Sequence, residues 1–171
     1  MASERATSRL SEAASMRVPI KPEPTATIRI VRALSEMVAL AGVAQERFLR
    51  AAGLREEQLD DLNARLRYGE IARICELAME LTGDPALGLH WAETHGSHAF
   101  IPVAHLILHA ATLRQGLASL AQFERLLSDE PNSRLIERDE CVTLRCVPAL
   151  DAASPAMRRF AADMMVASFL R

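Results

Sequence analysis

Aromatic side chains are scarce in this sequence of 171 residues, which has one tryptophan, one tyrosine and five phenylalanines. So few rings argue against a platform that stacks the bases of single-stranded nucleic acid, and they favour helices over a β-sandwich. The net charge is only −2, which argues against a broad basic face that grips a phosphate backbone. The composition therefore indicates a mostly helical globular chain that does not bind nucleic acid by itself.

Cysteine is scarce as well. The odd count of three (Cys75, Cys141 and Cys146), without a signal peptide, indicates reduced thiols and no disulfide framework. No apolar run approaches the roughly 20 residues that span a bilayer, and residues 1–24 lack the apolar segment of a secretory signal. We therefore expect a cytoplasmic protein without a membrane partner.

Sequence motifs of enzymes are also missing, since no GxGxxG, Walker A or GxSxG pattern occurs. His105 and His109 lie four residues apart on a predicted helix, which is a spacing that suits a metal. The residues between them are LIL, so the glutamate of the HExxH motif is absent. We interpret one histidine as a core residue and the other as half-exposed, and we expect no metal, no cofactor and no enzyme activity.

Helix signals dominate the rest of the chain. Apolar residues at helical spacing predict helices over 27–40, 44–52, 68–81, 85–94, 102–111, 112–127 and from 154 onward, with one or two further turns at 56–62. Residues 27–31 also fit an extended start, and residues 63–67 read as an extended connector. Residues 133–138 and 141–147 predict two strands of a hairpin. The expected fold class is α+β and predominantly α-helical, with six or seven helices and one β-hairpin near the C-terminus.

The expected organisation is a disordered tail over residues 1–25 and one domain over residues 26–171. Arg171 interrupts an apolar helical pattern that has no stop signal, and the hairpin has no third strand to cover its edges. We therefore expect the domain to be incomplete at its C-terminus.

A family resemblance is carried by ELTGDPALGLHWAE (residues 80–93) and TLRQGLASLAQFERLLSD (residues 112–129). Together with LRAAGL, ARLRYGEIARICELA and LIERDECVTLRC, these segments resemble the N-terminal sensor domain of AraC-type transcription regulators. The resemblance is to the arabinose-binding-like subgroup, distinct from the cupin sensors, and it covers about residues 27–171. The segment FIPVAHLILHAA departs from the family, which has small, glycine-rich residues there.

The resemblance implies an effector-sensing and self-association domain that binds a small molecule and forms a homodimer. It also implies that DNA is bound only through a C-terminal helix-turn-helix domain, which is missing from this chain. Two alternatives remain: a stand-alone helical module that forms mixed dimers with a full-length regulator, and a small metal-dependent enzyme that uses His105 and His109.

The ligand pocket is expected to be apolar and to lie between helices. Bulky or polar residues on otherwise aliphatic helix faces are the candidates for its lining: Trp91, Phe100, His105, His109 and Phe123. Each of these positions also fits an ordinary core residue. No functional residue is carried over from the family, because the resemblance rests on structural motifs.

Overall fold

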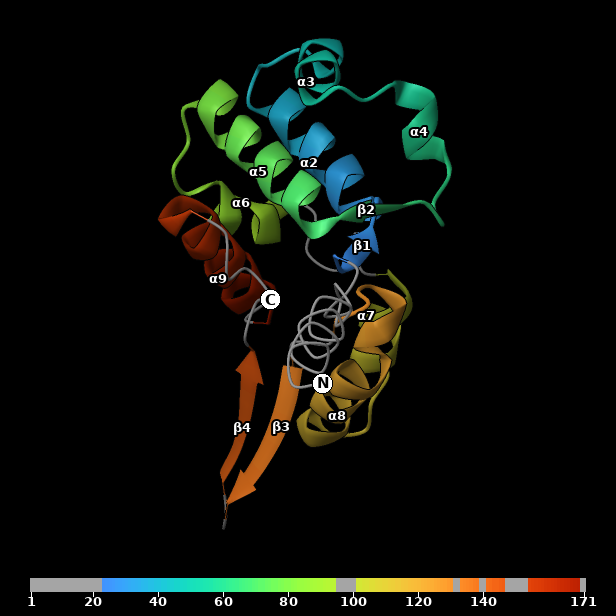
Figure 1. Ribbon diagram of the computed structural model, residues 1–171. Coiled ribbons are helices and arrows are strands. Elements are labelled where there is room, and N and C mark those ends of the chain that lie inside the picture. The colour runs from blue at the N-terminus through green and yellow to red at the C-terminus, as the bar shows by residue number, and fades with distance from the viewer. Residues whose placement is uncertain (1–22, 95–100, 131–132, 139–140, 147–153, 170–171) are drawn as a thin grey trace, which may run out of the picture.

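The structure is a computed structural model that describes residues 23–94, 101–130, 133–138, 141–146 and 154–169 (Figure 1). This part of the chain holds eight α-helices, one 3-10 turn and four short strands. In chain order they are β1 (Thr25–Thr27), α2 (Arg29–Leu40), α3 (Gln45–Ala52), α4 (Glu56–Asp60), β2 (Arg65–Arg67), α5 (Tyr68–Thr82), α6 (Leu87–Thr94), α7 (Ile101–Leu108), α8 (Leu113–Phe123), η2 (Glu124–Leu126), β3 (Ser133–Arg138), β4 (Cys141–Cys146) and α9 (Pro155–Phe169).

The expected α+β class with predominant helix is confirmed, and so is the hairpin near the C-terminus. In that hairpin β3 and β4 are antiparallel, with Ser133 opposite Cys146 and Arg138 opposite Cys141. The short helix α4, expected as one or two turns, brings the number of α-helices to eight. A second antiparallel pair, β1 with β2, was not predicted, because strands of three residues are too short to show an alternating pattern.

The helix ends follow local chemistry. The carboxylate of Glu70 accepts the Arg67 N–H at 3.0 Å at the start of α5, and Gly83 ends this helix with a φ of 66°. Asp84 holds the turn into α6, since one carboxylate oxygen accepts the Ala86 N–H at 2.8 Å and the other bonds His90 Nδ1 at 2.6 Å. The hydrogen bond to Asp84 raises the pKa of the His90 imidazole.

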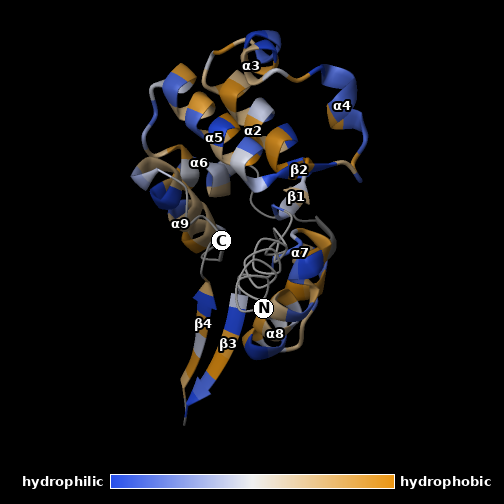
Figure 2. Ribbon diagram, viewed as in Figure 1, coloured by the Kyte–Doolittle hydropathy of each residue, from blue (hydrophilic) through white to orange (hydrophobic). Residues whose placement is uncertain are grey.

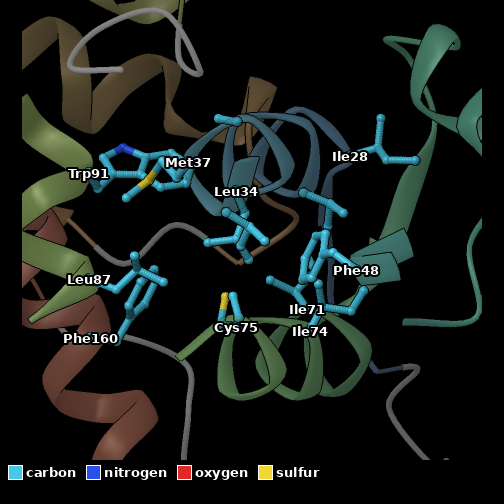
Figure 3. Close-up of a cluster of buried hydrophobic side chains, with 14 of the residues drawn as sticks. Ile28, Leu34, Met37, Phe48, Ile71, Ile74, Cys75, Leu87, Trp91 and Phe160 are labelled. Carbon is cyan, nitrogen blue, oxygen red and sulfur yellow. The ribbon is translucent and has the colours of Figure 1, made fainter. Parts of the chain in front are cut away.

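Most of the described helices pack around one apolar core. Polar and apolar residues alternate along α2 and α5 (Figure 2), as in helices that bury one face. The buried faces of α2 to α6 meet those of α9, and Figure 3 shows their side chains converging. We call residues 23–94 and 154–169 the helical unit. Its largest fully buried side chains are Trp91, Phe48, Phe160, Ile28 and Leu34.

A second set of elements packs separately. Helix α7 lies on α8, α8 lies on β3, and β3 pairs with β4. We call the described residues between 101 and 146 the hairpin unit; Val103, Ala104 and Leu120 are its buried apolar residues. None of its described residues belongs to the apolar core cluster of the helical unit. The chain leaves the helical unit after α6 and returns to it as α9, so the hairpin unit is an insertion (Figure 1).

Among the described helices, none combines the length and the apolar character that crossing a bilayer would take.

Candidate site at the junction of the two units

Residues 127–129, just after η2, run beside β1 and connect the two units. The Thr27 N–H donates to the Leu127 carbonyl at 2.9 Å, and the Asp129 N–H donates to the Thr25 carbonyl at 3.0 Å. The middle residues of the two segments form an antiparallel bridge. Strand β1 is therefore paired on both edges, with β2 on one side and residues 127–129 of the hairpin unit on the other. We call this contact the joint.

A charged side chain reinforces the joint. The Asp129 carboxylate accepts hydrogen bonds from the backbone N–H of Thr25 at 3.0 Å and from Nη2 of Arg65 at 2.9 Å. It also accepts the hydroxyl proton of Thr25. Arg65 in turn donates from Nε to the Thr25 hydroxyl at 2.9 Å. One carboxylate from the hairpin unit is thus held by β1 and β2 of the helical unit.

A second polar contact lies beside the first. The hydroxyls of Tyr68 and Ser128 are 2.5 Å apart, and the Ser128 hydroxyl donates to the Glu130 carbonyl at 2.8 Å. The Ser128 hydroxyl has one proton, and it donates that proton to the Glu130 carbonyl. Tyr68 is therefore the donor in the contact between the two hydroxyls. Ser128 is only 5 % exposed, so water competes little for these bonds. The start of α5 is thereby tied to the joint.

The joint is also continuous with the hairpin. Glu124, in η2, is 9 % exposed and its Oε2 accepts the Ser133 N–H at 2.8 Å, at the first residue of β3. The carbonyl of Glu124 accepts the N–H groups of Leu127 and Ser128 at 2.8 and 3.0 Å. One residue therefore holds both residues 127–128 and the start of β3. The joint and the first strand of the hairpin are therefore hydrogen-bonded to the same residue.

The charge of Asp129 makes the joint dependent on pH. Hydrogen bonds from the Thr25 side chain and backbone, with the nearby Arg65 guanidinium, hold the pKa of this carboxyl below its ordinary value. A lowered pKa means that the charged group stabilises the fold above its unfolded pKa, and that this stabilisation is lost as the pH falls through the folded pKa. We expect protection of the Thr25 amide from hydrogen exchange to fall below about pH 4, measured by NMR.

The matched variant for that measurement is Asp129→Asn, which cannot titrate and should show weak protection of the Thr25 amide at every pH. Asp60→Asn, on the exposed side of α4, should behave like the parent chain. Protection that stays constant from neutral to acid pH in the parent chain would contradict the role assigned to Asp129.

A cleft of about 280 Å³ opens next to the joint. Helical-unit residues form most of its wall, and two leucines of the hairpin unit complete it: Thr27, Arg29, Leu62, Asn63, Arg65, Leu126 and Leu127. A second cleft of about 250 Å³, lined by α3 and α5, lies wholly within the helical unit. The first cleft is the one whose wall both units share.

Residues 42–171, most of the chain, match the family model described as the arabinose-binding domain of AraC transcription regulators, N-terminal. The chain belongs to this family. The resemblance drawn from residues 80–93 and 112–129 is thereby confirmed. AraC-type sensor domains are parts of regulators, so the match identifies a regulatory sensing domain.

A curated relative agrees with the AraC assignment. The chain is 27 % identical over 141 residues to the ornithine utilization regulator of Pseudomonas aeruginosa. The alignment covers 82 % of this chain and 41 % of that regulator. The chain therefore spans less than half the length of this relative.

The pocket residues expected for this AraC-type domain lie in different places. Trp91 is 0 % exposed in the core of the helical unit (Figure 3), whereas Phe123 is half-buried on α8 of the hairpin unit. Phe100 lies outside the described residues. Neither of the two clefts above is lined by Trp91, Phe123, His105 or His109. The pocket that combines these residues stays a prediction.

His105 lies on the exposed side of α7, and His109 follows directly after the end of that helix. His105 and His109 are exposed, with ring centroids 5.7 Å apart, and Nδ1 of His109 donates to the His105 carbonyl at 2.9 Å. The interpretation of one of them as a core residue is wrong, because Val103 and Ala104 occupy the buried face of the helix. Within the described ranges, no three His, Cys, Asp or Glu side chains come together as a metal site.

The cleft residues gave no signal in the sequence. Arg29 and Arg65 look like ordinary solvated charges, and Leu126 and Leu127 look like the end of an apolar helix face. Their proximity depends on the pairing of β1 with residues 127–129, about a hundred positions away in the chain. The joint is a long-range contact, and periodicity reports only on local structure.

Proposed function

We propose that this AraC-type domain senses a small-molecule effector by changing how the hairpin unit is held against the helical unit. One observation carries the proposal: the described hydrogen bonds between the two units are those of the joint, and no described residue of the hairpin unit belongs to the apolar core cluster of the helical unit. A net hydrogen bond contributes only about 0.5–1.5 kcal/mol. A joint of this kind is therefore more easily rearranged than a shared apolar core.

An effector acts on such a joint only if it binds the two arrangements with different affinities. A tenfold difference in affinity corresponds to about 1.4 kcal/mol, which is comparable to one or two of the joint's hydrogen bonds. The difference in the ligand's binding free energy between the two arrangements is thus of the same order as the contribution of one or two hydrogen bonds of the joint. Even a weakly selective ligand would shift the population.

At the level of the regulator, we propose that the domain self-associates as a homodimer and has no enzymatic role. DNA contact is assigned to a separate helix-turn-helix domain, which fits the net charge of −2 of this chain. Exposed Leu106, Leu108 and Leu113 on α7 and α8 support self-association, because grouped apolar side chains mark interaction surfaces. A regulator of this kind acts in the cytoplasm. Sedimentation velocity of the full chain tests the dimer.

The test of sensing is a distance measurement on the full chain. A thermal-shift screen of metabolites first identifies a stabilising compound. Spin labels are then placed on native Cys141 of β4 and on Glu46→Cys of α3, both exposed, with Cys146 replaced by serine. Cys75 stays unlabelled, because burial raises the pKa of its thiol to about 12. We expect the distance distribution between the units to shift when the compound is added.

The control pair lies within the helical unit, with labels at Glu46→Cys and Arg158→Cys in a background in which both Cys141 and Cys146 are replaced by serine. This pair should keep its distance, since both labels sit on helices of one packed core. A compound that stabilises the protein and leaves the Cys141–Glu46 distribution unchanged would sink the proposal.

A further inference from the structure

The cleft at the joint has the composition of a ligand site. We propose that it binds a small carboxylate with an aliphatic body, and that this ligand bridges the helical and hairpin units. This inference rests on the proposed function and deepens it, because it gives the effector a place and a chemical class. Three features of the cleft support this ligand: the charge of its wall, its apolar surface and its position across the joint.

The described residues that line the cleft carry only positive charge. They include Arg29 and Arg65, and no aspartate or glutamate is among them. The Arg29 side chain makes no hydrogen bond or ion pair with the described residues. Arg65 uses Nε and Nη2 for Thr25 and Asp129, and none of these bonds involves Nη1. Guanidinium groups hold carboxylates through paired N–H donors, so the wall has donors to spare for a second carboxylate.

The remainder of the wall is largely aliphatic. Leu62, Leu126 and Leu127 line the cleft, and Leu126 is 57 % exposed. Covering this leucine with an aliphatic group removes apolar area from water, which is favourable. The volume of about 280 Å³ lies just below the usual range for small-molecule sites, which suits a small ligand. An inorganic anion would leave the leucines uncovered, so a small organic acid fits better.

The position of the cleft links occupancy to the joint. A ligand there contacts Arg29 and Arg65 of the helical unit and Leu126 and Leu127 of the hairpin unit. Arg65 also holds Asp129, so the ligand and the joint share one guanidinium. Because a ligand in the cleft contacts both walls only while the two units are held together, binding should favour the closed joint.

The test uses 4-methylpentanoate, with the isosteric amide 4-methylpentanamide and inorganic phosphate as comparison probes. Each is titrated into the full chain at millimolar concentration and followed by amide chemical shifts. We expect the carboxylate to bind at least about tenfold more tightly than the amide, since charge-assisted bonds are roughly twice as strong as neutral ones. The shifts should concentrate at Thr27, Arg29, Asn63 and Leu127.

Substitutions assign the binding to this cleft. Arg29→Gln should weaken 4-methylpentanoate binding about tenfold, and Arg29→Lys should weaken it less, because the charge remains. Arg32→Gln is the matched control, since Arg32 lies one turn further along α2, outside the cleft, and pairs with Glu36. Unchanged thermal midpoints would show that the variants fold.

Three results would overturn the inference: equal binding of carboxylate and amide, carboxylate binding that does not depend on Arg29, or phosphate binding as tight as that of the carboxylate. The failure of the proposed function looks different. A carboxylate that binds through Arg29 without moving the Cys141–Glu46 labels leaves the site intact and refutes the sensing mechanism. An effector that moves the labels independently of Arg29 refutes only this site.

Discussion

Replacing Trp91 with alanine should lower the free energy of unfolding by about 3–5 kcal/mol, the usual effect of truncating a large buried aromatic side chain. Trp91 is 0 % exposed, and it points from α6 toward Met37 of α2 (Figure 3). Leu87 and Trp91 are the residues through which α6 enters the core cluster. Truncation therefore leaves a cavity and also weakens the attachment of the helix that leads into the hairpin unit.

Urea denaturation followed by circular dichroism measures this effect, because the variant has no tryptophan left to report by fluorescence. Leu89→Ala is the control on the same helix. Its side chain is 43 % exposed, so its truncation should have a much smaller effect than that of Trp91. A Trp91→Ala chain as stable as Leu89→Ala would show that the core is not packed as described.

Replacing Gly88 with alanine should destabilise the protein by about 1–3 kcal/mol, the usual effect of overpacking. A Cβ at this position would lie 2.5 Å from the Phe160 carbonyl oxygen and 3.2 Å from its carbon. These are backbone atoms of α9, so α6 and α9 would have to move apart. The gain in helix propensity from glycine to alanine, about 1 kcal/mol, does not offset this clash.

Trp91 lies three residues after Gly88 on the same helix, so its fluorescence can report the unfolding of the Gly88→Ala variant. Its fluorescence during urea denaturation gives the midpoint for Gly88→Ala and for a matched control, Gly69→Ala. At Gly69 the added Cβ would meet Oε1 of Glu23, the end of a flexible side chain that accepts the Gly69 N–H, so that variant should lose less stability than Gly88→Ala. If both variants lose the same stability, the close contact of α6 with α9 is not the cause.

Local patterns predicted the helices well, and the structure explains why. The apolar spacing of α5 and the caps at Gly83 and Thr112 are properties of neighbouring residues, and they appear where expected. Residues 80–93 also carried the family resemblance, and Gly88 within them has a physical reason in its contact with Phe160. The segment that carries the family resemblance therefore also contains the close contact between α6 and α9 at Gly88.

The candidate site was not predictable in the same way. Choosing bulky residues on helix faces selects core residues such as Trp91, because size and burial go together. The cleft is formed instead by the ends of elements, with Arg29 and Leu126 brought together by tertiary structure alone. Such a site requires coordinates, since no single segment of the chain contains its pattern.

The double pairing of β1 has a practical consequence for handling the protein. Residues 127–129 cover the edge of β1 that β2 leaves free, so a variant that releases them would expose a row of unpaired N–H and carbonyl groups. Because open strand edges recruit other chains, we expect such a variant to aggregate more readily than the parent chain.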